Sequence, residues 1–374
     1  MKPVLCVFGT RPEAIKMAPV VRRLRETGAP YKVAVTAQHR GMLDQVLDIF
    51  EIVPDYDLNL MTPDQSLADL NARCLTGLNR VISECDPVCV VGQGDTTTVF
   101  ASALAAFYRG VPFAHVEAGL RSGDLRSPFP EEFNRVAASK LASLHFAPTE
   151  LAQNALLREG IDPTTILMTG NTVIDAVEIA RARIEPMTLP GFDAFGLITV
   201  HRRENFGQPV ENIIAAIREI ALARPAFGFI WPVHPNPNIK NRVHEALGDL
   251  SNVFLREPLD YSEFLSALSG ASIALSDSGG VQEEAPTLKT PVLVLRTETE
   301  RPEGVTAGAA LLIGVERRTI VENALRLIDE PHARAAMLVE RSPYGDGNSA
   351  RRIVDALAQR YLGDVKPCGM ASRA

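Results

Sequence analysis

Short apolar runs alternate with amphipathic helical stretches along almost the whole chain. Runs such as VLCVF (4–8), KVAVTA (32–37) and PVCVVG (87–92) are each followed by a stretch with helical features. This alternation is typical of parallel sheets that are covered by helices on both faces. The pattern therefore predicts an α/β protein built on doubly wound parallel sheets.

The alternation occurs in two successive halves. A chain of 374 residues is longer than one ordinary domain, which predicts two domains. The stretch at 185–196 carries Pro186, Pro190 and Gly191, and we expect it to be the linker between domains 1–184 and 185–344. A ligand is then expected in the cleft between the carboxyl ends of the strands of the two halves. The last 12 residues, from Gly363, are expected to form a frayed tail.

Composition restricts the classes of partner. Hydrophobic residues make up 46% of the chain and charged residues 22%, as in a compact soluble protein. A formal net charge of −7 argues against nucleic-acid binding, so a phosphate group should be met locally by a few Arg and Lys. The five cysteines have no zinc-finger spacing, which predicts no metal site and a reducing compartment. Without a targeting segment or an apolar run of roughly 20 residues, we expect a cytoplasmic protein with no membrane partner.

One predicted strand-to-helix junction has the features of a phosphate-binding turn. Residues 276–285 read SDSGGVQEEA, follow an apolar run, and precede a short helix that Pro286 must end. Glycine lets the backbone approach an anion closely, and the first N–H groups of a helix point toward it. The sequence therefore predicts that Ser278, Gly279 and Gly280 hold a diphosphate.

Two carboxylates follow in the same segment. Glu283 and Glu284 lie within one helical turn of the glycines, and carboxylates accept hydrogen bonds from sugar hydroxyls. Together these features predict a nucleotide site, with the diphosphate at the helix tip and the ribose one turn later. The alternative is an ordinary strand-to-helix turn, because short glycine motifs also occur without a ligand.

Other polar residues follow further predicted strands, where a doubly wound fold places its site. They are Arg11, Lys16, Asp95, Glu117, Glu131 and Glu132 in the first half, and His201, Arg202, Arg203, His234 and Arg301 in the second. Each of them, taken alone, has a structural alternative. Glu117 could pair with Arg121, Asp95 could cap the helix that begins at Thr96, and His234 could be a buried core imidazole. Their joint placement after successive strands favours a functional site.

The combination of carboxylates and cationic groups among these residues indicates an elimination reaction. Breaking a sugar–diphosphate bond while a proton moves on the adjacent carbon needs a base and a stabilised leaving group. A carboxylate is a weak base, so much of the developing charge must be carried by the diphosphate. The cations that could stabilise this charge are Arg11, Lys16, His201 and Arg301. Neither a dinucleotide-binding nor a Walker pattern follows the first strand, which gives no support to NAD-dependent or ATP-driven chemistry.

The motifs together resemble the bacterial non-hydrolysing UDP-N-acetylglucosamine 2-epimerases over residues 4–361. They are GTRPEAIKMAP, VTAQHR with MLDQVL, GDTTT, HVEAGLR, SP-x-PEE-x-NR, TGNTVIDA, HRREN, PVH-x-NPN, DSGGVQEEAP, TERPEG and SPYGDG. The resemblance implies a glycosyltransferase-B type fold of two Rossmann-like domains, with a C-terminal helix at about 345–362 that joins the first. It also implies a homodimer that requires no cofactor.

The activity implied by the resemblance is the reversible interconversion of UDP-N-acetylglucosamine and UDP-N-acetylmannosamine. The family route is anti elimination of UDP to 2-acetamidoglucal followed by re-addition, in the synthesis of cell-envelope or exopolysaccharide precursors. Domain 1–184 would carry the acid/base carboxylates, and domain 185–344 would bind UDP.

Individual positions match the functional positions of the family. Asp95, Glu117 and Glu131 match its acid/base carboxylates, and we group His201 with them. The residues that match UDP-contacting positions, or that we add to them, are Arg11, Lys16, His201, His234, Phe264, Ser278, Gly279, Gly280, Glu284 and Arg301. Phe264 stands where the family flanks the uracil.

The chain departs from the family pattern at several positions. Gln93 replaces a His, Thr297 replaces a frequent Asp, and Leu259 stands where some relatives have Gln. Some relatives bind a second UDP-N-acetylglucosamine as an activator. Gln38 and Glu131 of that site remain, whereas Gly41 offers no side-chain donor at its first position and Asp64 stands near its second.

Two alternatives to an epimerase follow from the same features. A UDP-sugar glycosyltransferase of the same fold shares the glycine-rich loop but has no need of three carboxylates in its first half. A non-catalytic UDP-sugar sensor would bind the nucleotide sugar without turnover, and the complete carboxylate set argues against it.

Overall fold

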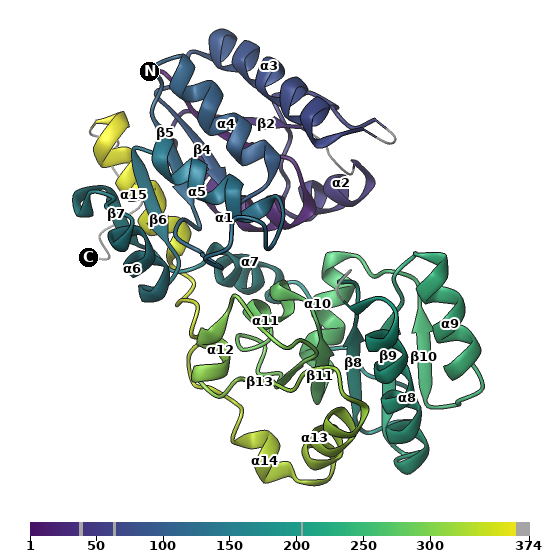
Figure 1. Ribbon diagram of the computed structural model, residues 1–374. Helices are drawn as coiled ribbons and strands as arrows, with labels where there is room; N and C mark the ends of the chain where they lie inside the picture. Colours follow the sequence, from purple (N-terminus) through teal and green to yellow (C-terminus); the bar gives the residue numbers. More distant parts are fainter. Residues whose placement is uncertain (37–39, 63–64, 203–204, 364–374) are drawn as a thin grey trace. The chain divides into compact units, whose positions relative to one another are not determined.

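The protein forms two compact units (Figure 1), seen in a computed structural model that describes residues 1–36, 40–62, 65–202 and 205–363. Unit 1 comprises Met1–Glu178 and Gly345–Ala374, and unit 2 comprises Ile179–Tyr344. The sequence predictions for Gln38, Asp64, Arg203 and the tail after Gly363 lie outside the described residues.

Unit 1 is built on a seven-stranded sheet with the order β3-β2-β1-β4-β5-β6-β7, in which every strand pair is parallel. Its strands are β1 (Val4–Phe8), β2 (Tyr31–Val35), β3 (Tyr56–Asp57), β4 (Cys89–Gln93), β5 (Phe113–Val116), β6 (Leu144–Ala147) and β7 (Ile166–Met168). The central strands β1 and β4 are buried at every residue, which explains their continuous apolar sequence.

Helices α1 to α6 connect these strands, and α7 and α15 complete the helices of unit 1 (Figure 1). They are α1 (Arg11–Glu26), α2 (Arg40–Ile49), α3 (Leu67–Cys85), α4 (Thr97–Tyr108), α5 (Glu131–Leu141), α6 (Glu150–Arg158), α7 (Thr172–Arg181) and α15 (Ser349–Leu357), with a 3-10 turn at Pro163–Thr165 and a π-helical turn at Ala358–Leu362. Helix α15 comes from the C-terminal segment and packs on α1.

Unit 2 repeats the architecture on a six-stranded parallel sheet with the order β10-β9-β8-β11-β12-β13. Its strands are β8 (Phe195–Thr199), β9 (Gly228–Pro232), β10 (Val253–Arg256), β11 (Ile273–Ser276), β12 (Val292–Val294) and β13 (Ala310–Leu312). Its helices are α8 (Gln208–Ala223), α9 (Pro237–Leu247), α10 (Tyr261–Gly270), α11 (Gly279–Glu284), α12 (Pro302–Thr306), α13 (Arg317–Asp329) and α14 (Pro331–Ala335).

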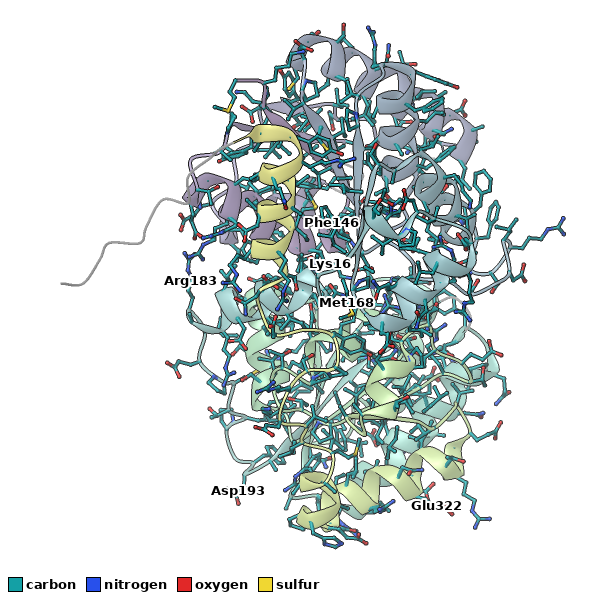
Figure 2. The ribbon with its side chains drawn as sticks, turned by 90° about the vertical axis from the view of Figure 1, so that its left-hand side faces the viewer. Lys16, Phe146, Met168, Arg183, Asp193 and Glu322 are labelled. Atoms are coloured by element: carbon teal, nitrogen blue, oxygen red, sulfur yellow. The ribbon has the colours of Figure 1, made fainter. Side chains whose placement is uncertain are left out.

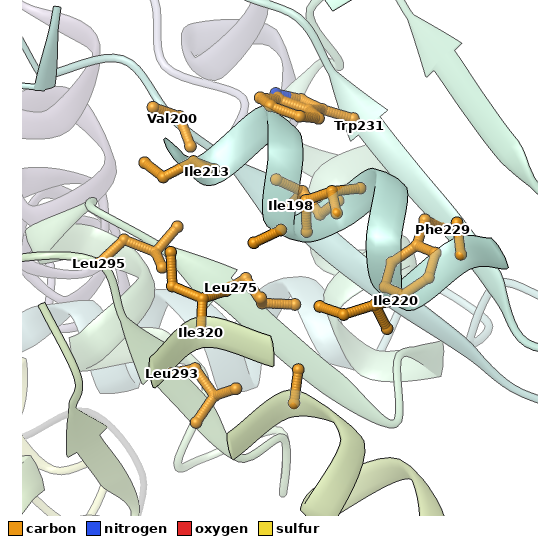
Figure 3. Packing of buried hydrophobic residues seen from close by; sticks show 14 of the residues in the cluster. Ile198, Val200, Ile213, Ile220, Phe229, Trp231, Leu275, Leu293, Leu295 and Ile320 are labelled. Carbon is orange, nitrogen blue, oxygen red and sulfur yellow. The ribbon is translucent and has the colours of Figure 1, made fainter. Parts of the chain in front are cut away.

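A core of buried hydrophobic side chains stabilises unit 2 (Figure 3). Side chains of the central strands, among them Ile198 of β8 and Leu275 of β11, are completely buried. They pack against α8 and α13 through residues such as Ile213 and Ile320. Burying a side chain of this size contributes about 1.5–3 kcal/mol to the free energy of folding. This packing stabilises the sheet that carries the loops at its carboxyl edge.

In both sheets the strand order reverses at one point. The reversal lies between β1 and β4 in unit 1 and between β8 and β11 in unit 2. In doubly wound sheets a ligand binds beyond the carboxyl ends of the strands at this point. The prediction of two Rossmann-like, doubly wound domains is confirmed.

The stretch at 185–196, predicted as a linker, makes its contacts within unit 2. The backbone N–H of Met187 donates to the Ser266 carbonyl at 2.9 Å, and the Ser266 hydroxyl donates to the Glu185 carbonyl at 2.6 Å. A side chain at Gly270 would collide with the Met187 carbonyl. This stretch therefore packs on α10, and the chain passes between the units at Glu178–Ile179, within α7.

None of the described helices is both long enough and apolar enough to cross a bilayer.

Candidate active site

A buried carboxylate joins the two turns at the strand reversal of unit 1. Glu13 accepts hydrogen bonds from the backbone N–H groups of Gly9 at 2.9 Å and Thr10 at 2.7 Å. Its other oxygen accepts from the Thr96 hydroxyl at 2.5 Å. Thr10 is the N-cap of α1 and forms a reciprocal capping box with Glu13. The turn after β1 is thereby bonded to the turn after β4.

Asp95 lies in the turn after β4 and contacts two residues of α5. Its carboxylate lies 2.9 Å from Nη2 of Arg135, and its backbone carbonyl accepts from the Asn134 amide at 2.9 Å. The cap of α4 is Thr96, whose hydroxyl accepts from the Val99 N–H at 3.3 Å. The alternative in which Asp95 is the helix cap is therefore wrong.

Glu132, the second residue of α5, anchors the loop that precedes this helix. Its two oxygens accept from the backbone N–H groups of Ser122 at 3.0 Å and Gly123 at 3.1 Å, and one of them lies 3.4 Å from Nε of Arg135. Its neighbour Glu131 is the first residue of α5 and is only half-buried. The two adjacent carboxylates therefore differ in their surroundings, because Glu132 is buried and hydrogen-bonded to the loop whereas Glu131 is half-buried.

Lys16 and Glu117 form a nearly buried ion pair, with Nζ 2.5 Å from Oε2 and side chains that are 10% and 7% exposed. Figure 2 labels Lys16. The backbone of Glu117 is left-handed, with φ of 63°, which costs a non-glycine residue about 1–3 kcal/mol. Arg121 pairs instead with Glu159, at 2.6 Å between Nε and Oε1. The alternative in which Glu117 pairs with Arg121 is therefore wrong.

In unit 2 the fully buried carboxylate of Asp277 organises the turn after β8. It accepts from the backbone N–H groups of His201 at 3.0 and 3.1 Å and Arg202 at 2.9 Å, and from the Asn205 amide at 3.0 Å. It also lies 3.2 Å from Nδ1 of His201, whose side chain is 45% exposed. Burial raises the pKa of Asp277, but hydrogen bonding and the charge of His201 outweigh it and lower the pKa below its usual value.

His234 follows the neighbouring strand, β9. Its Nδ1 accepts a hydrogen bond from the backbone N–H of Asn236 at 3.1 Å. Burial lowers the pKa of His234, and the nearby His201 lowers it further. The side chain is only half-buried, so the alternative of a buried core imidazole is wrong.

The glycine-rich segment forms the strand-to-helix turn that the sequence predicts. Ser278 is the N-cap of α11, and its N–H donates to the Ser276 hydroxyl at 2.9 Å. A Cβ atom at Gly279 would lie 2.7 Å from both Cζ and Nη1 of Arg301. Gly279 is therefore needed for the guanidinium to lie against the start of α11.

Two carboxylates hold the Arg301 guanidinium. Its Nε donates to Oε1 of Glu283 at 2.6 Å, and its Nη1 lies 3.6 Å from Glu300. Glu300 also accepts from Arg296 at 2.7 Å. Burial raises the pKa of Glu300, but these two cations dominate and lower it to about 2. Glu283, predicted to reach sugar hydroxyls, is buried and bonded to Arg301, while Glu284 beside it is also buried.

Comparison with known proteins identifies the family. A family model described as UDP-N-acetylglucosamine 2-epimerase matches residues 22–358. The chain belongs to this family. It is 49% identical to the UDP-N-acetylglucosamine 2-epimerase of Salmonella typhimurium over 367 residues, which cover 95% of this chain and 98% of the relative.

Solved structures of the family have the same fold. The Neisseria meningitidis UDP-GlcNAc 2-epimerase bound to UDP-GlcNAc has a TM-score of 0.90 and 46% identity, covering 96% of this chain and 100% of that one. The Methanocaldococcus jannaschii enzyme in complex with UDP-GlcNAc and UDP has a TM-score of 0.80 and 34% identity, covering 96% and 99%. The predicted family and fold type are confirmed.

The predicted site residues of this family member fall into two groups, one in each unit. Unit 1 contains Arg11, Lys16, Asp95, Glu117 and Glu131. Unit 2 contains His201, His234, Phe264, Ser278, Gly279, Gly280, Glu284 and Arg301. In each unit most of these residues lie on segments that follow the carboxyl ends of strands or in the first turn of the next helix. Lys16 lies in the second turn of α1, and Glu284 is the last residue of α11.

Sequence reasoning missed the residues that hold the site turns. Glu13 could have been found, because T-x-x-E within GTRPE is a capping-box pattern. Asp277 stands directly after a predicted strand, but nothing in SDSGG indicates that it receives hydrogen bonds from residues more than 70 positions away. Glu132 was among the predicted polar residues, but its hydrogen bonds to the loop were not predicted, and Arg135 carried no signal of its contact with Asp95.

Proposed function

We propose that this protein interconverts UDP-N-acetylglucosamine and UDP-N-acetylmannosamine by inverting C2 of the sugar. Nearly full-length membership of the UDP-N-acetylglucosamine 2-epimerase family supports this activity. The observation that carries the mechanism is the set of three carboxylates, Asp95, Glu117 and Glu131, on segments at the carboxyl edge of one sheet.

The chemistry is an elimination and a re-addition. A carboxylate removes the C2 proton, the bond from C1 to the diphosphate oxygen breaks, and the electron pair leaves with UDP. The product is 2-acetamidoglucal, with a double bond between C1 and C2. UDP then adds back to C1 while a second carboxylate returns a proton to the opposite face of C2. No other reagent is required for the atoms and charges to balance.

The environments of the carboxylates suggest their roles. We assign the proton transfers to Asp95 and Glu131, one removing the proton and the other returning it. Glu117 is held by Lys16 at 2.5 Å, and we assign it an orienting role. The Arg135 guanidinium, 2.9 Å from the Asp95 carboxylate, holds this carboxylate in place.

The residues of unit 2 are assigned to the UDP moiety. Ser278, Gly279 and Gly280 offer backbone N–H groups to the phosphates. Arg301 supplies positive charge to the leaving diphosphate, with His201. Glu283 and Glu300 orient the Arg301 guanidinium, so its position is fixed before the ligand arrives.

Epimerisation in D2O tests this mechanism. We expect deuterium at C2 of the product, because the C–H bond is broken and the carboxylate exchanges its proton with solvent. Asp95→Asn and Glu131→Gln keep the shape but remove a base, so we expect a rate loss of about 10² to 10⁴-fold with retained UDP binding. Product without deuterium would exclude elimination. Near-normal rates in both variants would leave the elimination standing and overturn the residue assignment.

Several further expectations stay predictions. They are the homodimer, the absence of a cofactor, the cytoplasmic location and the supply of cell-envelope or exopolysaccharide precursors.

A further inference from the structure

A completely buried histidine of unit 1 is hydrogen-bonded to the turn that carries Asp95. His115 belongs to β5, which is buried at every residue. Its ring nitrogen Nε2 lies 2.7 Å from the carbonyl oxygen of Gly94, the residue before Asp95. A carbonyl oxygen can only accept a hydrogen bond, so Nε2 carries a hydrogen and donates it. The imidazole therefore bonds β5 to the turn that follows its neighbour, β4.

The His115 ring is held in one protonation state. Burial lowers the pKa of His115 to about 3, and the bond to Gly94 opposes this only in part. A neutral imidazole has one hydrogen, and the Gly94 carbonyl fixes it on Nε2. The ring is therefore a neutral donor to this carbonyl throughout the neutral pH range.

The second ring nitrogen distinguishes His115 from an ordinary core histidine. Its Nδ1 is buried and has no hydrogen-bond partner in the part of the chain that the structure describes. A buried polar atom without a partner lowers stability, so an apolar side chain would suit this strand position better. His145, its register partner on β6, has a partner at each nitrogen, the Ser139 carbonyl at 2.8 Å and the Thr165 hydroxyl at 3.3 Å. The polar contact of His115 is instead with a turn of the candidate site.

This contact helps to fix the backbone on both sides of Asp95. The N–H of Gly94 donates to the Val116 carbonyl at 3.0 Å, and the Gly94 carbonyl accepts from His115. The Asp95 carbonyl accepts from the Asn134 amide at 2.9 Å. The two peptide groups that flank the Asp95 α-carbon are thus each hydrogen-bonded, which determines the direction in which the Asp95 side chain leaves the backbone.

We propose that His115 is a positioning residue for proton transfer by Asp95, through the hydrogen bond from its Nε2 to the Gly94 carbonyl. Glu117 directly follows β5, so the same strand sets the place of two carboxylates of the mechanism. His115 acts through Asp95 and exchanges no proton itself. The inference rests on the proposed epimerase function and on the acid/base role assigned to Asp95.

A double-mutant cycle on the turnover of UDP-N-acetylglucosamine tests the proposal. His115→Leu removes the donor and places an apolar residue on a buried strand. Because small misplacements of a reacting group slow the chemistry, we expect kcat to fall by about 10 to 10²-fold, with KM and UDP affinity unchanged. In the Asp95→Asn background the same substitution should lower kcat by less than about twofold, since the group that it positions is already absent.

Two further variants separate positioning from packing. His115→Gln keeps an amide donor at a similar reach from the backbone and should recover most of the lost turnover. His145→Leu removes a bond of the same kind from a buried ring on the next strand. Its partner Ser139 lies in the last turn of α5, whereas Glu131 begins this helix, so we expect a near-native kcat. Rates are expressed per UDP-binding site, which removes the effect of any unfolded fraction.

The outcomes distinguish this inference from the proposed function. Native turnover in His115→Leu, or an equal fall in the native and Asp95→Asn backgrounds, would overturn the inference and leave the epimerase function standing. An equal fall in His145→Leu, or no recovery in His115→Gln, would also overturn it, because packing would then account for the loss. Absence of epimerisation by the native protein would remove both.

Nitrogen-15 NMR of the His115 imidazole in the native protein adds a test that needs no variant. We expect the hydrogen on Nε2 and no titration of the ring between about pH 5 and 8. A hydrogen on Nδ1 of the neutral ring, or a ring that titrates in this range, would contradict the proposal.

Discussion

Buried carboxylates hold the turns that carry the candidate site residues. Glu13, Glu132 and Asp277 each accept hydrogen bonds from at least two backbone N–H groups of a turn. Hydrogen bonds to a charged group contribute about 1.5–3 kcal/mol each, more than bonds between neutral groups. The turns are therefore fixed by side chains that are themselves shielded from solvent.

The ion-pair partners of Glu117 and Arg121 could not be predicted from the sequence. Lys16 and Glu117 both follow predicted strands, so their common edge was foreseeable, but they are separated by 101 positions. The prediction of Arg121 as partner chose a residue nearby in sequence. Glu117 has a left-handed backbone, and its side chain contacts Lys16. The side chain of Arg121, four residues later, contacts Glu159 instead.

The Lys16–Glu117 pair provides a prediction of stability. Lys16→Met removes the cation beside a nearly buried carboxylate, and we expect a loss of about 3 kcal/mol of unfolding free energy. The double variant Lys16→Met/Glu117→Gln should recover much of this loss but none of the activity. Lys2→Met, in the exposed pair with Asp86, is the control and should change little. Denaturant unfolding measures all three, and an equal response of Lys16→Met and Lys2→Met would contradict the prediction.

At the scale of elements, the end of α11 and the strands on either side of it were predictable from the sequence. The helix ends at Glu284, in agreement with the prediction that Pro286 closes it. The strands that flank it were also predictable, because each is a continuous apolar run in a parallel sheet. The position of the connection between the two units was not predictable, because proline and glycine occur both in linkers and in packed segments such as 185–196.

Two adjacent glycines of α11 should respond differently to a methyl group. Gly279→Ala places Cβ 2.7 Å from the Arg301 guanidinium, and we expect a loss of about 1–3 kcal/mol and weaker UDP binding. At Gly280 the nearest atom to an added Cβ is the Ser278 hydroxyl at 3.7 Å. Gly280→Ala should therefore keep or raise stability, by at most about 1 kcal/mol. Thermal unfolding with and without UDP compares them, and equal melting temperatures would exclude this explanation.

At the scale of the molecule, unit 1 is assembled from both ends of the chain. Helix α15 packs on α1, and its side chains Ile353, Val354 and Leu357 are buried. Asp175 of α7 accepts from the first N–H groups of α15, those of Ser349 at 3.2 Å and Ala350 at 2.9 Å. The C-terminal helix is therefore part of the fold of unit 1.

Removing this contact should loosen unit 1 selectively. Asp175→Ala leaves two buried N–H groups without their acceptor, and we expect a local loss of about 1–3 kcal/mol. Hydrogen exchange should accelerate in α15 and along α1, while α8 in unit 2 keeps its protection. Asp355→Ala, at an exposed position of the same helix, is the matched control. Uniform acceleration in both units would show that α15 supports the whole chain instead.

The divided construction of unit 1 has a consequence for biosynthesis. Translation proceeds from the N-terminus, so the ribosome delivers all seven strands of the first sheet, and then the whole of unit 2, before α15 is made. During that interval the surface of α1 that α15 later covers has no partner from its own chain. Unit 2 is continuous in sequence, whereas unit 1 needs a segment from each end of the chain. Unit 1 therefore cannot be completed until the C-terminal segment has been made.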